Sequence, residues 1–395
     1  MSLFYGERSG GIRTYLDAKA RWAADTGLLD HHVIVPGRRR GGHGPLRHEV
    51  RSLRVAASNG YRIPLGAREL KATLRDLRPD AVLLHDPYWD PLGTARVGRE
   101  LGALVVAVHH TSSALNAASL RGPFGLYRPV LARWFAHAYD GADAIMAACD
   151  PSRDSGGRPA ALPLRFGLHP ALRPGGGVRR GSHVLYVGRL AREKGVFSLV
   201  EAAARSREPW SLEIVGTGPS GGALEARVRR LGLERRVRFR PYLGDRADLA
   251  RAFQRAACVV CPGEHETFGL VTLEAAASGA RVVACATAPA AALVGALAET
   301  YEPGDLGEML RAIDRARGAE PDLEAAAALG ARFTWAAAFT AELSALRALR
   351  AAPEAHRDGN PSARARPGVG HRAGGRGPSA LRGGRTGART SLGAR

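Results

Sequence analysis

The sequence predicts an α/β protein with two Rossmann-like, doubly wound domains. Its 395 residues, 45% of them hydrophobic, suffice for two domains of ordinary size. Short apolar runs alternate with helical stretches along most of the chain, as in parallel sheets covered by helices. A stretch rich in proline and glycine, 159–174, separates two such series and is typical of a linker.

The first series makes up a predicted N-terminal domain, residues 1–165. A short apolar stretch, Leu3–Tyr5, precedes Gly10, Gly11 and a helix predicted from Ile12 to Ala24. Because a helix N-terminus is partly positive, a glycine pair there can border a phosphate. The stretch is short for a first strand, as if the strand began upstream. A shortened strand is expected to make the sheet of the N-terminal domain less stable. Later strands are predicted at 32–35, 53–56, 81–85, 104–109 and 144–148, and helices at 67–77 and 126–139.

Histidines follow two of the predicted strands, where parallel sheets place their ligand contacts. His85 ends one strand, and His109 and His110 end the next. A histidine at a strand end is often only a hydrogen-bonded structural residue, so the residues alone leave both roles open. The helix 126–139 combines aromatic and basic side chains. It suits either an interfacial helix near anionic lipid or a crossover helix packed on the sheet.

A predicted C-terminal domain, residues 178–335, opens with a strand that ends at Gly188. Arg189 and Lys194 flank the turn into the next helix. A diphosphate with about two negative charges requires such partners, since arginine offers a bidentate fork and lysine a point charge. Solvated surface charge is the alternative.

The next strand leads into Gly216, Gly218 and Gly221, in the pattern G-x-G-x-x-G. This pattern favours a rival hypothesis, a nicotinamide-dependent oxidoreductase. Such a protein needs an acidic residue about twenty positions further on. Arg238 and Arg240 stand there instead, and they suit only a 2′-phosphate.

Two glutamates eight positions apart, Glu266 and Glu274, lie between two apolar runs of strand type. The segment between these runs is expected to form one helix, with Thr267 as its N-cap and a left-handed exit at Gly279. Eight helical residues rise about 12 Å, so an elongated polar ligand could meet both carboxylates while Gly269 lets its backbone approach closely. Alternatively, Glu266 only complements the helix dipole and Glu274 is a solvated surface residue.

The stretch E-T-F-G-L-V-T-L-E, followed by A-A-A-S-G-A-R-V-V, resembles the E-x7-E signature of the retaining family-four glycosyltransferases. That family has the GT-B fold, and the resemblance therefore implies two Rossmann-like domains that face each other across a cleft. G-R-L-x-x-E-K-G at 188–195 resembles the diphosphate-binding motif of that family. The resemblance extends over about residues 4–350. The chain departs from the family at Arg240, where glycine is usual, and at His169, where aspartate is usual.

The resemblance implies a role for each candidate residue. Glu266 would contact the donor sugar, Glu274 the ribose, and His110 the reacting centre, with His109 as the second choice. His85 is only an acceptor-side candidate. The residues implied in donor binding are Gly10, Gly11, Gly188, Arg189, Lys194, Gly216, Gly218, Glu266, Phe268, Gly269, Leu270 and Glu274, and those implied in catalysis are His110, Glu266, Arg189 and Lys194.

The implied activity is transfer of a sugar, with retention, from GDP-mannose or a UDP-sugar to a glycan, lipid or small-molecule acceptor. No metal or other cofactor is expected, because fixed cations can neutralise the diphosphate. The alternatives are an NAD(P)-dependent Rossmann oxidoreductase and a noncatalytic nucleotide-sugar-binding protein. A helix at 336–350 is expected to return to the first domain, as in the family.

Charge and composition limit the kinds of partner and the location that are expected. The net charge is +20, but nine arginines and one acid from Arg357 onward supply +8 of it. This tail, 353–395, has almost no large apolar residue and is predicted to be disordered. Nucleic acid is not an expected partner. Cys258 and Cys261 are expected to be buried thiols and not zinc ligands. Without a long apolar run or secretory signal, the predicted location is the cytoplasm, with membrane association at its inner face as an option.

Overall fold

The computed structural model describes residues 1–3, 5–6, 10–37, 46–54, 62–120, 122–158, 161–175 and 178–351. The predicted disordered tail lies outside the described residues. Contacts join Met1–Pro353 into one unit, and the domain boundaries drawn from the sequence remain predictions. For reference, the N-terminal half is the described part up to residue 175, and the C-terminal half begins at 178. No helix among the described residues is long and apolar enough to cross a membrane.

The C-terminal half contains a six-stranded parallel sheet in the order β10-β9-β8-β11-β12-β13. Its middle strands are short and almost entirely buried, as expected when helices cover both faces. The chain enters at β8, proceeds outward to β10, and then returns to β11. The strands are β8 (Val184–Val187), β9 (Leu212–Val215), β10 (Val237–Arg240), β11 (Cys258–Cys261), β12 (Val282–Cys285) and β13 (Ala298–Tyr301).

This strand order creates a switch point between β8 and β11, where the direction of winding reverses. Ligands of open parallel sheets bind outside the carboxyl ends of the strands at such a point. The segment after β8 contains the predicted cations Arg189 and Lys194, and the segment after β11 contains Glu266. The helices of this half up to residue 318 are η1 (Arg192–Lys194), α6 (Val196–Arg205), α7 (Gly221–Arg230), α8 (Arg246–Arg255), α9 (Leu270–Ala277), α10 (Pro289–Val294), η2 (Gly295–Leu297) and α11 (Leu306–Gly318).

The N-terminal half contains two smaller sheets. Strands β4 (Ala81–Leu84), β5 (Leu104–His109), β6 (Ala144–Ala147) and β7 (Leu162–Pro163) form a parallel sheet in that order. Strand β1 pairs in parallel with β2, and β2 pairs antiparallel with β3. The strands of this second sheet are β1 (Val33–Gly37), β2 (Arg47–Arg54) and β3 (Arg62–Pro64).

The predicted strand at Leu3–Tyr5 is not observed, and residue 4 lies outside the described residues. The first two residues instead bridge the two sheets. The Ser2 amide donates to Ile34 on β1, and the Met1 carbonyl accepts from His85 at the end of β4. The Met1 ammonium donates to a β4 carbonyl at 2.8 Å, and burial lowers its pKa to about 5.

Helices predicted from apolar periodicity are confirmed within a few residues as α1 (Gly11–Thr26), α2 (Arg68–Leu77) and α5 (Phe124–Tyr139). Two other helices in the described part of the N-terminal half were not predicted, α3 (Pro91–Glu100) and α4 (Ser113–Ser119). Each has a side-chain N-cap, Asp90 and Ser112 respectively. The strand predicted at 53–56 overlaps β2 only at residues 53 and 54, and residues 55 and 56 lie outside the described residues. The earlier start was missed because the sequence of β2, R-H-E-V-R-S-L-R, is mostly polar and buries little beyond its centre.

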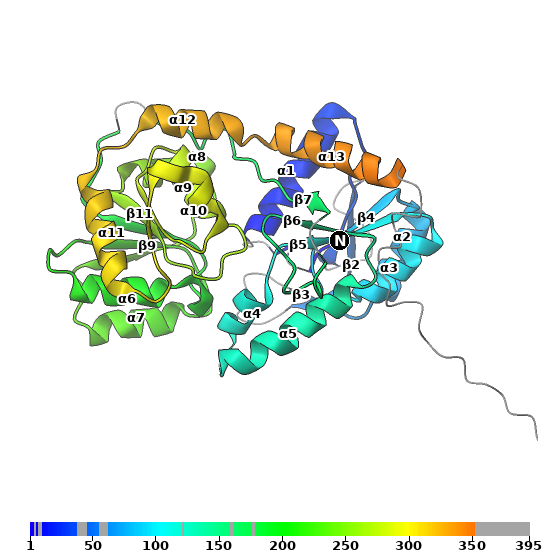
Figure 1. Ribbon diagram of the computed structural model, residues 1–395, viewed down its shortest axis with the longest axis horizontal. Coiled ribbons are helices and arrows are strands. Elements are labelled where there is room, and N and C mark those ends of the chain that lie inside the picture. Colours follow the sequence, from blue (N-terminus) through cyan, green and yellow to red (C-terminus); the bar gives the residue numbers. More distant parts are fainter. Residues whose placement is uncertain are drawn as a thin grey trace, which may run out of the picture. The chain divides into compact units, whose positions relative to one another are not determined.

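The predicted linker contributes to the N-terminal sheet through β7 and so is not only a connection. At the other end of the chain, α12 (Leu323–Arg332) leads into α13 (Trp335–Ala351). Helix α13 returns to the N-terminal half and lies beside α1 (Figure 1). The Tyr15 hydroxyl and the Lys19 ammonium, both on α1, bond to the buried Glu342 of α13.

Candidate active site

A cavity of about 420 Å³ lies between the two halves, at the carboxyl ends of β8 and β11. It is lined by most of the residues that the sequence singled out. These are Gly10, Gly11, His110, Gly188, Arg189, Lys194, Gly216, Glu266, Phe268, Gly269, Leu270 and Glu274. Three predicted residues, Gly218, His85 and His109, do not line it.

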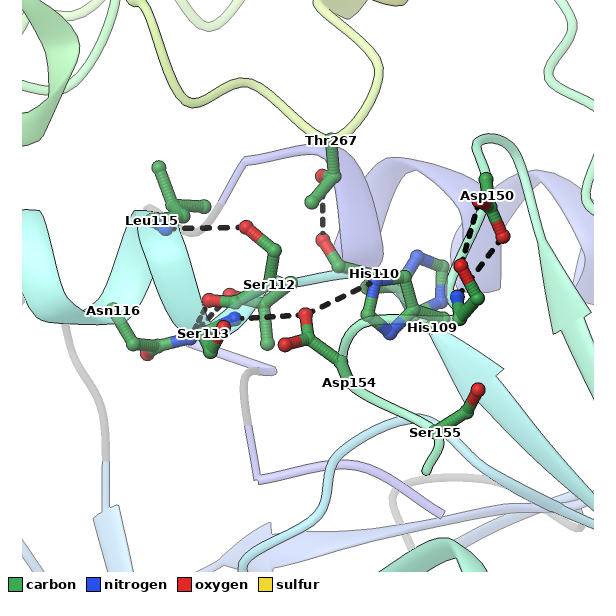
Figure 2. Close-up of polar contacts among 12 residues, drawn as sticks. His109, His110, Ser112, Ser113, Leu115, Asn116, Asp150, Asp154, Ser155 and Thr267 are labelled. Carbon is green, nitrogen blue, oxygen red and sulfur yellow. Dashed lines mark hydrogen bonds and ion pairs between the residues drawn. The ribbon is translucent and has the colours of Figure 1, made fainter. Parts of the chain in front are cut away.

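The helix expected to contain both glutamates is shorter than predicted. Helix α9 begins at Leu270 after Gly269, whose φ of +89° favours glycine. Glu266 therefore lies in the preceding turn, and the rise of about 12 Å expected for a continuous helix does not apply. Thr267 is not the N-cap, because its hydroxyl donates to the carbonyl of His110 at 2.8 Å (Figure 2). This bond joins the turn to the end of β5.

The first glutamate and one predicted phosphate ligand are neighbours. Lys194 Nζ lies 2.7 Å from Glu266 Oε1, and both side chains are about four-fifths buried. Gly195 permits this approach: a Cβ there would lie 2.1 Å from the carbonyl oxygen of Pro262. Arg189 pairs with the buried Glu193 on the other side of the turn. A phosphate-linked sugar placed here would meet a cation and an acid together.

The second glutamate, Glu274, is buried, so the alternative that it is a solvated surface residue is excluded. Glu274 Oε1 lies 3.4 Å from Nη1 of Arg246, which begins α8. The other arginine nitrogen, Nη2, donates to the Thr14 hydroxyl on α1 at 3.0 Å. Burial raises the pKa of the Glu274 carboxyl, and Arg246 opposes that shift. Arg246 thus links the predicted ribose ligand to the other half of the protein.

His110 lines the cavity, whereas the other two histidines lie behind it. Its Nε2 is 2.7 Å from Nδ1 of His85, and burial lowers the pKa of His110 to about 3. His109 is buried on the other side of the strand, with Nδ1 3.1 Å from the Tyr139 hydroxyl. Its Nε2 lies 3.8 Å from Asp154 (Figure 2). The assignment of His109 as the second choice and of His85 to the acceptor side therefore does not agree with their positions.

The oxidoreductase pattern has a structural explanation. A Cβ at Gly218 would lie 2.3 Å from the Leu190 carbonyl oxygen, so this glycine allows close packing of two loops. Arg240, which a 2′-phosphate would need, forms an ion pair with Glu213 at 2.9 Å. Burial raises the pKa of both Cys258 and Cys261 to about 12. Cys258 is a buried thiol as predicted, whereas Cys261 is half-buried and lines the cavity.

The chain matches two family models. Residues 9–157 match Glycosyltransferase Family 4, and residues 181–317 match Glycosyl transferases group 1. Over 313 residues it is 30% identical to the GDP-mannose-dependent alpha-(1-6)-phosphatidylinositol dimannoside mannosyltransferase of Mycobacterium tuberculosis (strain ATCC 25177 / H37Ra), covering 72% of this chain and 78% of that protein.

The chain belongs to the family-four glycosyltransferases.

Other proteins similar to this glycosyltransferase support the family assignment. It is 28% identical to the D-inositol 3-phosphate glycosyltransferase of Kribbella flavida, over 86% of this chain and 91% of that one. Among solved structures, sucrose-phosphate synthase from Thermosynechococcus elongatus superposes with a TM-score of 0.63 at 21% identity, covering 88% and 96% of the chains. Anabaena HepE in complex with UDP and glucose gives 0.65 at 18%, covering 87% and 98%. The predicted GT-B fold and the enzyme class are confirmed.

The glycosyltransferase cavity also contains residues that sequence reasoning missed. Besides Arg246 and Thr14, they include Tyr242 after β10 and Asn116 on α4. A polar residue at the start of a helix has no distinctive local pattern. Arg246 follows the N-cap Asp245, and that cap is the only signal in the sequence that could have drawn attention to it.

Proposed function

We propose that this glycosyltransferase moves a sugar from a nucleotide diphosphate sugar to an acceptor hydroxyl, with retention at the anomeric carbon. The observation that supports this best is the ion pair between Lys194 and Glu266. Both residues line one cavity, together with Arg189, Glu274 and His110. In this assignment the diphosphate lies at Arg189 and Lys194, the sugar at Glu266, and the ribose at Glu274. The backbone of residues 268–270 orients the sugar from the start of α9.

In the proposed reaction the bond from the anomeric carbon to the diphosphate oxygen breaks, and a bond to the acceptor oxygen forms. The acceptor proton passes to the departing diphosphate, on the same face of the sugar. Cations placed where negative charge develops lower the barrier, because they need no reorganisation. His110 is neutral near pH 7, since its pKa is lowered to about 3, so it acts as a hydrogen-bonding partner and not as a charged acid.

We also propose that no metal ion is required. Arg189 and Lys194 supply positive charge at the leaving group, the role that a divalent cation has in other phosphate-transfer sites. Transfer rates measured with and without EDTA test this proposal. Strict dependence on Mn²⁺ or Mg²⁺ would contradict it.

GDP-mannose is the donor that we propose first, with UDP-sugars second. The mannosyltransferase relative is named for GDP-mannose, whereas Anabaena HepE was solved with UDP and glucose. Thermal-shift measurements with GDP, UDP and ADP and their sugars would rank the donors. Purified protein should then transfer or hydrolyse the best one. Binding without any turnover would favour a noncatalytic sugar-nucleotide-binding protein, and NADPH binding without nucleotide-sugar binding would favour the oxidoreductase.

We propose a lipid-linked or glycan acceptor that is reached at the inner face of the cytoplasmic membrane. On α5, Leu126 and Val130 are each 62% exposed and Trp134 is 43% exposed. Their spacing of four residues places them on one helical face, and Arg133 is exposed beside them. This combination suits an anionic interface. Cosedimentation with phosphatidylinositol vesicles should exceed that with phosphatidylcholine vesicles, and Leu126→Asp with Val130→Asp should abolish the difference.

A further inference from the structure

Two histidines from neighbouring strands meet behind the cavity. His85 follows β4 and His110 follows β5, and these strands pair in parallel. The ring nitrogens His85 Nδ1 and His110 Nε2 are 2.7 Å apart, and the rings stack with centroids 5.0 Å apart and an angle of 17° between their planes. His85 is only 3% exposed and does not line the cavity. It reaches the cavity only through His110.

Both rings are neutral near pH 7. Burial lowers the pKa of His85 well below its usual range and that of His110 to about 3. A hydrogen bond between two neutral imidazoles contains one proton, so the tautomer of one ring sets that of the other. Within the described part of the chain, Nδ1 of His110 has no hydrogen-bond partner. It is the nitrogen left for a ligand, and its protonation depends on His85.

Residues of α1 and α13 pack behind the His85–His110 pair and hold it in place. The Tyr15 ring is fully buried, with its centroid 5.6 Å from that of His85 and 5.8 Å from that of His110. Its hydroxyl donates to Glu342 of α13, whose other oxygen bonds to Lys19. A buried carboxylate with two partners is costly to disturb. The C-terminal helix therefore fixes the ring that packs against both histidines.

We infer that His85 is a positioning residue of this enzyme. It holds the His110 imidazole at one angle and in one tautomer at the cavity wall, and Tyr15 with Glu342 keeps both rings in place. The inference rests on the proposed function, in which His110 faces the reacting centre. Second-layer partners of this kind usually change activity by about 10- to 100-fold when they are removed.

Variants of His85 that keep the position of Nδ1, of Nε2 or of neither nitrogen test the inference. Asparagine places its amide where Nδ1 of His85 lies, whereas glutamine reaches only the position of Nε2. We expect His85→Asn to retain kcat within about 3-fold. His85→Gln and His85→Leu should lose about 10- to 100-fold in kcat, with the donor KM changed far less. Thermal unfolding of each variant shows whether the loss follows stability instead.

The chain offers a matched control. His32 Nδ1 and His48 Nε2 form a similar pair, 2.9 Å apart with stacked rings, beside β1 and β2 and away from the cavity. His32→Leu should leave kcat as in the wild type. Equal losses in His85→Asn and His85→Leu that follow stability, or full kcat in His85→Leu, would overturn the positioning role.

Nitrogen-15 NMR of the imidazoles gives a readout besides activity. Wild-type His110 should show a single neutral tautomer, and His85→Gln should show a mixture. A mixture already present in the wild type would overturn the inference. If the wild type transfers no sugar from any donor, the proposed function fails, whereas the tautomer result still decides whether His85 sets the state of His110. Should His85→Leu not fold, the asparagine and glutamine variants still answer the question.

Discussion

Replacing Glu274 with glutamine separates two properties of the same side chain. Glu274 is 6% exposed, and its Oε1 lies 3.4 Å from Arg246. Burial raises the pKa of the carboxyl even though Arg246 opposes the shift, so desolvation outweighs the ion pair. Glutamine has nearly the same shape and no charge. We expect Glu274→Gln to leave the free energy of unfolding unchanged or to raise it by up to about 1 kcal/mol.

Nucleotide binding should change in the opposite direction. Hydrogen bonds from ribose hydroxyls to a carboxylate contribute about 1.5–3 kcal/mol, which corresponds to about 10- to 150-fold in Kd. Isothermal titration calorimetry with GDP and UDP measures this loss, and urea unfolding measures stability. Because the ribose does not react, kcat at saturating donor should fall much less than the affinity.

Arg246→Met provides the reverse case, since it leaves the Glu274 carboxylate buried without its cation. Its stability should fall, by up to about 3 kcal/mol. If Glu274→Gln binds both nucleotides as the wild type does, or unfolds more readily than the wild type, the ribose does not lie on this carboxylate and the reasoning is refuted.

Three further predictions concern the cation, the turn and the histidines. Lys194→Met should reduce kcat/KM about 100- to 1,000-fold in initial-rate assays, and a loss below 5-fold would contradict its role at the leaving group. Gly195→Ala should destabilise the protein more than Gly232→Ala in urea unfolding, because both have a similar positive φ but only the first Cβ meets a carbonyl. Equal losses would exclude the clash. His85 and His110 have lowered pKa values when folded, so below pH 6.5 the unfolded chain binds protons that the folded chain does not. The free energy of unfolding should therefore fall between pH 6.5 and 5, by up to about 1.4 kcal/mol per pH unit for each histidine, and a flat profile would contradict this.

Much of the fold could be predicted from local patterns. Apolar periodicity located α1, α2 and α5, and apolar runs located most strands of the C-terminal sheet. The start of β2 was not predicted, because this strand is mostly polar and only its centre is buried. Short capped helices such as α4 have too few turns for a period to show.

Most of the candidate site could also be predicted, because a strand end or a helix start is a local feature. The motifs at 188–195 and 266–274 located Arg189, Lys194 and both glutamates, which line one cavity. The residues alone could not show which histidine faces that cavity, because successive residues of a strand point to opposite faces and the register of β5 depends on its neighbours. The preference for His110 over His109 came from the family resemblance. The structure places His110 at the wall and His109 beside Tyr139.

By itself, the sequence determined the α/β class, the glycosyltransferase motifs and the residue types that a diphosphate and a sugar require. Only the tertiary structure decided the pairings: Lys194 with Glu266, Arg246 with Thr14 and Glu274, and Tyr15 with Glu342. These partners are 28 to 327 positions apart along the chain. Local preferences act over a few residues, whereas such contacts form only when packing of the whole core brings distant segments together.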